Sequence, residues 1–113
     1  MADATPVLNI KREYPDGAIL QIVIWQLPQP TTERPHGYKY RLNYSLADGS
    51  TLVRYDNERG KGDHKHIRDI QHPYKFTSTR QLLSDFNADV LDNGEPYDEK
   101  ENAANTDNNE ALC

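Results

Sequence analysis

Cysteine is almost missing from the 113-residue sequence, whose only one is Cys113, the last residue. A disulfide framework and a cysteine-based metal site are therefore excluded, because each needs several cysteines. The lack of disulfides favours a reducing compartment. Residues 1–6 also lack the basic and apolar regions of a signal peptide, so we expect a cytoplasmic protein.

Long hydrophobic runs are missing too. The longest run, residues 18–27, is interrupted by Gln21 and Gln26 and falls far short of the ~20 apolar residues needed to span a bilayer. Hydrophobic residues make up 35% of the chain and the mean hydropathy is −0.93, so the core must be small. We expect no membrane role.

Cofactor-binding signatures are a third absence. The sequence has neither a dinucleotide-binding fingerprint nor zinc-finger spacing. Gly60-Lys61-Gly62 is not a phosphate-binding loop, because it lacks the earlier glycine and the Ser or Thr that follows lysine in such loops. We therefore expect no cofactor.

The net charge of −5 is unevenly distributed along the chain. From residue 93 onward there are six acids and one base, whereas residues 1–92 contain twelve of each. Asn, Asp, Glu and Ala dominate after residue 94, and few apolar side chains remain to be buried. The composition predicts a single domain over residues 1–92 and a disordered acidic tail over residues 93–113.

The sequence predicts four strands, over residues 7–14, 18–27, 38–46 and 51–57. Apolar and polar residues alternate in the first and third, residues 18–27 are dense in β-branched residues, and residues 51–57 return after a hairpin. Proline and glycine turn signals, at residues 15–17 and 48–49, separate the strands of each pair. Residues 18–27 are apolar on both faces, which predicts a central strand covered on each side.

The hairpin around Asp48-Gly49 has a predictable register. A two-residue loop places Ala47 opposite Ser50 and, further along, Arg41 opposite Asp56 on the polar face. This register depends on the loop length, because a slip of one residue would invert the faces. Arg41 and Asp56 are then either an ordinary surface ion pair or part of a functional site that continues into the next segment.

A helix is predicted near the end of the domain. Ser78 and Gln81 have capping-box spacing, and Asn93-Gly94 is a stop signal. The apolar residues at helical spacing, which predict its core-facing side, are Leu82, Leu83, Phe86 and Val90. Residues 69–76 are predicted to be an extended connection. The predicted fold class is α+β, with an antiparallel sheet of about four strands covered on one face by this C-terminal helix.

The most reactive part of the sequence is residues 54–68, with five cations, three carboxylates and two histidines. Gly60 and Gly62 let the backbone bend sharply around Lys61. Imidazoles titrate near neutrality and can act as acid, base or metal ligand. The segment predicts an exposed loop with a catalytic or anion-binding site, and a solvated polar turn is the alternative.

RNA cleavage through the ribose 2′-hydroxyl is the interpretation that we favour for this loop. It needs a base, an acid and cations near the developing negative charge, and it needs no metal. The predicted acid/base pair is His64 and His66, with Asp56 and Asp63 orienting the imidazoles. The predicted phosphate-binding residues are Arg41, Arg54, Arg59 and Lys61.

Two other interpretations of the loop stay open. His64, His66 and a carboxylate have the donor types of a metal site, although the Lys65 ammonium opposes a cation. Alternatively, the loop is a non-catalytic docking or regulatory surface that binds protein or nucleic acid. His36 and His72 lie in proline-adjacent connections and are predicted to be structural or solvated. The oligomeric state is open, and a homo-oligomer is compatible with the sequence.

The order and spacing of several segments between about residues 17 and 90 resemble the TumE-like toxin family. The most specific of them is the run Tyr55-Asp56-Asn57-x-x-Gly60-Lys61-Gly62-Asp63-His64-x-His66. The resemblance implies a small prokaryotic toxin, encoded with a helix-turn-helix antitoxin that binds and silences it. It implies no particular mechanism, so RNA cleavage rests on the residues and on analogy with other toxins. The long acidic tail and Arg68 depart from the family pattern.

Overall fold

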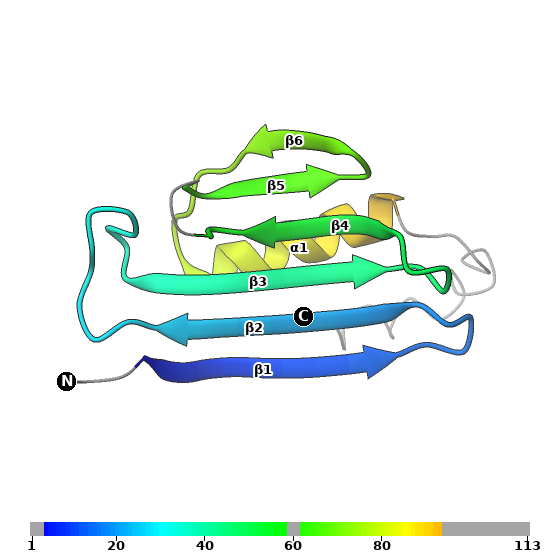
Figure 1. Ribbon diagram of the computed structural model, residues 1–113, viewed down its shortest axis with the longest axis horizontal. Helices are drawn as coiled ribbons and strands as arrows, with labels where there is room; N and C mark the ends of the chain where they lie inside the picture. Colours follow the sequence, from blue (N-terminus) through cyan, green and yellow to red (C-terminus); the bar gives the residue numbers. More distant parts are fainter. Residues whose placement is uncertain (1–3, 59–61, 94–113) are drawn as a thin grey trace.

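The described part of the chain forms one antiparallel sheet with a single helix on one side. The computed structural model describes residues 4–58 and 62–93. The strands follow one another in the order of the sequence, each paired with its neighbour (Figure 1). They are β1 (Thr5–Glu13), β2 (Ile19–Gln26), β3 (Tyr38–Ser45), β4 (Thr51–Asp56), β5 (His64–Ile67) and β6 (Ile70–Pro73), and the helix is α1 (Thr79–Asn93).

The predicted α+β class is correct, but the predicted number of about four strands is wrong. The described sheet has six strands, because the segment interpreted as a loop returns as β5 and then turns back as β6. The turn between them contains Arg68 with a positive φ of 58°, a conformation that non-glycine residues rarely adopt. Residues 94–113 lie outside the described residues, so the domain boundary and the acidic tail stay predictions.

The register around Arg41 and Asp56 is the predicted one, although the loop is not. Arg41 lies opposite Asp56 and Leu42 lies opposite Tyr55. The amide of Leu46 donates to the carbonyl of Ser50, which makes the loop one residue longer than a two-residue turn. A register shift between Tyr44 and Ser45 compensates for the extra residue, so the faces near Asp56 are unchanged.

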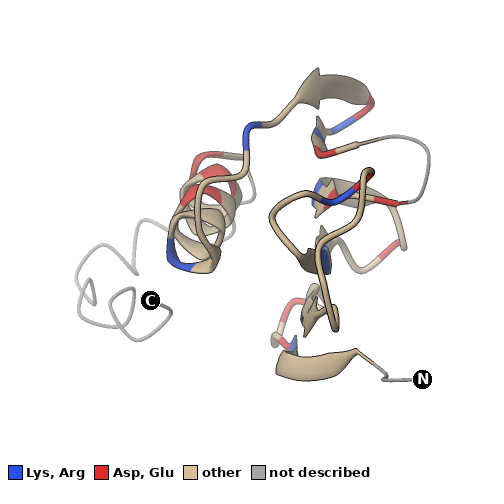
Figure 2. Cartoon of the chain, turned by 90° about the vertical axis from the view of Figure 1, so that its left-hand side faces the viewer, with Lys and Arg blue, Asp and Glu red and all other residues tan. Residues whose placement is uncertain are grey.

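The core lies between α1 and the middle of the sheet. Leu82 and Phe86 of α1 are buried in the core, and Phe86 packs edge-on against Tyr55, which is itself fully buried. Figure 2 shows the helix on one side of the sheet. The Ser78 side chain accepts a hydrogen bond from the Gln81 amide at 3.0 Å, which is one half of the predicted capping box; the Gln81 side chain donates to Asp85 instead, at 2.8 Å. Figure 1 shows α1 crossing behind the sheet.

The other side of the sheet, here called the open face, is covered by no element among the described residues. Alternation along β2 places Ile19, Val23 and Trp25 on it, each only half buried. The expectation that residues 18–27 are covered on both sides is therefore wrong for the described part of the chain. No helix in that part is long and apolar enough to cross a membrane.

Candidate functional site on the open face

Strand pairing gathers the predicted site residues on the open face. Arg54 and Asp56 alternate along β4 with the core residues Val53 and Tyr55, and so point away from α1. Their partners across β4 and β5 are His66 and His64. On the other side of β4, Arg41 lies opposite Asp56. Three strands thus bring two cations, one carboxylate and two imidazoles into adjacent positions of one face.

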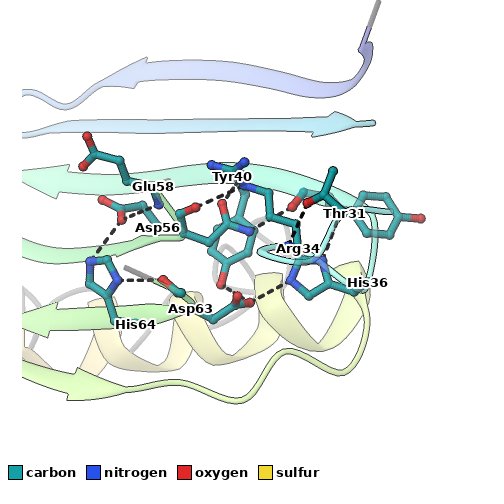
Figure 3. A network of polar contacts seen from close by, with 11 residues as sticks. Thr31, Arg34, His36, Tyr40, Asp56, Glu58, Asp63 and His64 are labelled. Atoms are coloured by element: carbon teal, nitrogen blue, oxygen red, sulfur yellow. Dashed lines mark hydrogen bonds and ion pairs between the residues drawn. The ribbon is translucent and has the colours of Figure 1, made fainter. Parts of the chain in front are cut away.

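Asp56 is the centre of this group. Its Oδ1 lies 3.1 Å from His64 Nε2, and its Oδ2 lies 3.2 Å from Arg54 Nε. The Glu58 amide also approaches Oδ1, at 3.4 Å (Figure 3). Arg54 Nε has no hydrogen bond of good geometry despite the short distance, so its contact with Asp56 is mainly electrostatic. A nearly buried carboxylate is thereby matched by positively polarised neighbours, as its burial requires.

His64 is not the solvent-exposed imidazole that the sequence led us to expect. The residue is only 3% exposed, because the pairing of β5 with β4 places its ring against Asp56. Nδ1 lies 3.0 Å from the carbonyl oxygen of Gly62, and Nε2 faces Asp56. Both nitrogens therefore face acceptors, and a ring protonated at both positions would satisfy both. This geometry suits a positioning residue.

His66 is the more accessible of the two imidazoles. Its ring lies 5.3 Å from that of His64 and nearly perpendicular to it. Arg54 donates a hydrogen bond from its terminal nitrogen to His66 Nδ1 at 2.9 Å, which requires a lone pair on Nδ1. Burial lowers the pKa of His66, and the nearby Arg54 and His64 lower it further. Its neutral form, the form that can accept a proton, is thus favoured.

Asp63, which was predicted to orient an imidazole of the pair, is engaged elsewhere. Its Oδ2 accepts hydrogen bonds from the Tyr40 hydroxyl and from His36 Nε2, each at 2.9 Å (Figure 3). Tyr40 is buried in the core on the helix side, and burial together with Asp63 raises its pKa, so its hydroxyl stays a donor. Asp63 therefore belongs to a second group, next to His64 in sequence but not bonded to it.

His36 has a specific partner that the sequence did not reveal. Its ring stacks on Phe76 with a centroid distance of 4.0 Å, and its Nδ1 accepts a hydrogen bond from the Tyr38 amide at 3.1 Å. Nε2 must then carry the proton that it donates to Asp63. Because His36 and Asp63 are 27 residues apart, no local spacing could have indicated the pair.

Asn57 is a second residue whose role no sequence pattern indicated. It is 1% exposed, and both the oxygen and the nitrogen of its side-chain amide form hydrogen bonds to the backbone of β3. Its Oδ1 accepts from the Tyr40 amide at 3.1 Å, and its Nδ2 donates to the Tyr38 carbonyl at 2.8 Å. Arg34 in turn donates to the Asn57 carbonyl at 3.2 Å. These bonds fix the end of β4, and with it Asp56.

Two of the predicted phosphate-binding residues, Arg59 and Lys61, lie outside the described residues. Arg41 is exposed on the open face, and Arg54 is partly exposed beside it. Among residues 4–58 and 62–93, no group of three metal-ligating side chains is found. Chemically, the open face offers a neutral imidazole beside guanidinium groups, which suits proton removal close to an anion.

The family comparison gives a clear result. A family model described as Toxin TumE matches residues 3–93, which covers the whole described domain. Neither the curated proteins nor the solved structures give a match. The match includes the open-face group and the His36–Asp63 pair. The chain therefore belongs to the TumE toxin family and is the toxin component of a toxin–antitoxin module.

Proposed function

We propose that this toxin arrests growth by cleaving RNA on the open face, without a metal, with His66 as the general base. The observation that supports this best is the hydrogen bond from Arg54 to Nδ1 of His66, which keeps a lone pair on that nitrogen. An imidazole with a lowered pKa beside a guanidinium combines a base with an anion-binding group.

The proposed reaction begins when the scissile phosphate draws the Arg54 guanidinium away from His66. The freed Nδ1 removes the proton from the ribose 2′-hydroxyl, and the 2′-oxygen attacks phosphorus. The bond from phosphorus to the 5′-oxygen breaks, and the departing oxygen takes a proton from water. The products are a 2′,3′-cyclic phosphate, a 5′-hydroxyl and a protonated His66, which then loses its proton to the hydroxide formed.

The other residues hold this arrangement in place. Asp56 and His64 fix the positions of Arg54 and His66 through the contacts described above. Arg41 lies opposite Asp56, where it can bind a phosphate next to the scissile one. Arg59 and Lys61 belong to the same phosphate-binding set by their place in the sequence. Asp63 acts at a distance, since its bonds to Tyr40 and His36 secure the chain that enters β5.

A family toxin implies an antitoxin partner. We propose that this partner carries a helix-turn-helix domain and that it silences the toxin in the cytoplasm by covering the open face. A non-catalytic docking role for the same face is the second candidate. It is favoured by one observation, the occupation of both nitrogens of His64, because a free acid/base pair would leave at least one nitrogen of each ring accessible.

RNA sequencing after induction separates these two functions. We expect wild-type protein to arrest growth and to create new RNA 5′ ends, and His66→Ala to abolish both, since a general base contributes ~10²–10⁴-fold. His72→Ala is the matched control, because His72 lies on β6 outside the open-face group. Growth arrest without new RNA ends would instead favour the docking role, and arrest by folded His66→Ala would reject His66 as the base.

A further inference from the structure

The open face carries an apolar strip that the described elements leave uncovered. Ile19, Val23 and Trp25 point to this side of β2 and are half buried rather than buried. β2 lies next to the edge strand β1, and a strand whose outer side faces water does not need apolar residues there. The strip is therefore a candidate surface for a ligand, and its neighbours indicate which one.

Cations border the strip on both sides. On β3, Lys39 lies opposite Trp25 and Arg41 lies opposite Val23. On β1, Lys11 lies opposite Gln21, the residue between Ile19 and Val23 on this face. All three cations are exposed. Apolar and aromatic groups between exposed cations match the bases and phosphates of a single-stranded nucleic acid.

The strip is continuous with the proposed catalytic group. A shallow depression of about 230 Å³, lined by Gln21, Val23, Arg41 and Asn43, lies between β2 and β3. Asn43 lies opposite Arg54, and Arg54 lies opposite His66. From His66 to Trp25 the path crosses three strand spacings and four residues, roughly 20 Å. That distance corresponds to a few nucleotides of an extended strand.

We propose that the open face of β2 and β3 is a track for single-stranded RNA, on which Trp25 stacks against a base a few nucleotides from the scissile bond. This inference rests on the proposed function, because it assigns the substrate path to the same site. Lys39 and Arg41 bind the phosphates along the track, and the depression takes the base nearest to the site. Asp85 and Asp89 of α1 lie on the opposite side of the sheet, and the exposed acid Glu13 lies opposite Ile19, at the end of the strip away from Trp25.

Trp25 is the only tryptophan in the chain, so its fluorescence reports on the track directly. The full-length protein is titrated with an oligouridylate of about eight nucleotides, a length within the usual site sizes for such surfaces. Its 2′-O-methyl form lacks the nucleophile and is not cleaved. We expect saturable quenching of Trp25. Trp25→Ala should weaken binding, measured by anisotropy of the labelled oligonucleotide, about 5- to 100-fold, and Trp25→Phe should restore most of it.

The cations are tested through salt dependence. Lys39→Ala should reduce the slope of log affinity against log salt by about 0.7, the value for one phosphate contact on a single strand. The matched control is Arg12→Ala, because Arg12 is an exposed cation of β1 that lies opposite Leu20, a core residue of the helix side. Arg12→Ala should leave affinity and slope unchanged. Circular dichroism confirms that each variant is folded.

The outcomes separate this inference from the proposed function. Quenching and a weakened Trp25→Ala, with no cleavage of any RNA, would support the track and remove the RNA-cleaving activity. Cleavage that requires His66, with no quenching and no loss in Trp25→Ala, would overturn the track and leave the activity standing. Quenching by purified antitoxin but not by the oligonucleotide would also overturn it, because the strip would then be a protein interface.

Discussion

Replacing Asp56 by asparagine tests whether this carboxylate holds the open-face group together. The substitution keeps the volume and removes the charge. Asp56 is only 8% exposed, and a hydrogen bond to a charged group contributes ~1.5–3 kcal/mol, which applies to its 3.1 Å contact with His64 Nε2. The Arg54 side chain is 30% exposed, so that ion pair adds at most ~1 kcal/mol.

An asparagine can still accept one neutral hydrogen bond, which keeps ~1 kcal/mol of the stabilisation that the carboxylate provides. We therefore expect Asp56→Asn to lower the free energy of unfolding by about 2 kcal/mol, and the melting temperature by ~8–16 °C for a domain of this size. Differential scanning calorimetry and urea unfolding measure both quantities. Asp69→Asn is the control, because Asp69 is an exposed acid in the turn between β5 and β6.

A loss below ~0.5 kcal/mol for Asp56→Asn would refute this reasoning, because surface substitutions commonly fall in that range. Asp56 would then be a solvated acid beside His64 rather than the group that positions it. An equal loss in Asp69→Asn would refute it too, since the effect would then come from net charge. If the reasoning holds, the variant should also arrest growth less at a temperature where it remains folded.

Three further predictions concern His66, Asn57 and Lys65. Folding lowers the pKa of His66 below its ordinary value of 6.5, so the unfolded chain binds a proton on this ring more tightly than the folded chain does. The free energy of unfolding should therefore fall as the pH drops through 6.5 and level off below the folded-state pKa. Urea titrations at several pH values measure this. The rate of RNA cleavage should rise with pH along one limb that inflects below 6.5, and Arg54→Gln should move this inflection upward; an unmoved inflection would mean that the guanidinium does not act on the ring. Asn57→Ala should lower the free energy of unfolding by ~2–4 kcal/mol, since two backbone groups of β3 lose their partner, and a calorimetric loss under ~1 kcal/mol would contradict the assigned role. Lys65→Met should cost less than ~1 kcal/mol by urea unfolding, because its 3.0 Å pair with Asp89 is partly exposed; a larger loss would show that α1 depends on this pair.

The sequence could predict the hairpin of β3 and β4 because its two faces differ sharply. Tyr40, Leu42 and Tyr44 alternate with polar residues, so only one register buries them, and that register carries Arg41 to Asp56. The predicted register near Asp56 is correct although the predicted loop length is wrong, because burial of the apolar face constrains the strands more than the turn does.

The sequence could not show β5 and β6, because their alternation is carried by polar residues. His64 and His66 occupy one face and Lys65 the other. Because all three side chains are polar, a pattern based on hydropathy predicts a loop here. The bonds that bury His64 come from Asp56 and from the Gly62 carbonyl, and such bonds depend on a sheet that must already be formed. The pairing of His36 with Asp63 is hidden for the same reason, since it joins segments that only the fold brings together.

The chemistry of the cleaved ends tests the central proposal most directly. Purified full-length protein is incubated with single-stranded RNA in a chelator, and the new ends are identified by mass spectrometry. We predict 2′,3′-cyclic phosphate and 5′-hydroxyl ends from wild-type protein and from His72→Ala, and none from His66→Ala. Ends with 3′-hydroxyl and 5′-phosphate groups, or undiminished cleavage by His66→Ala, would contradict the account.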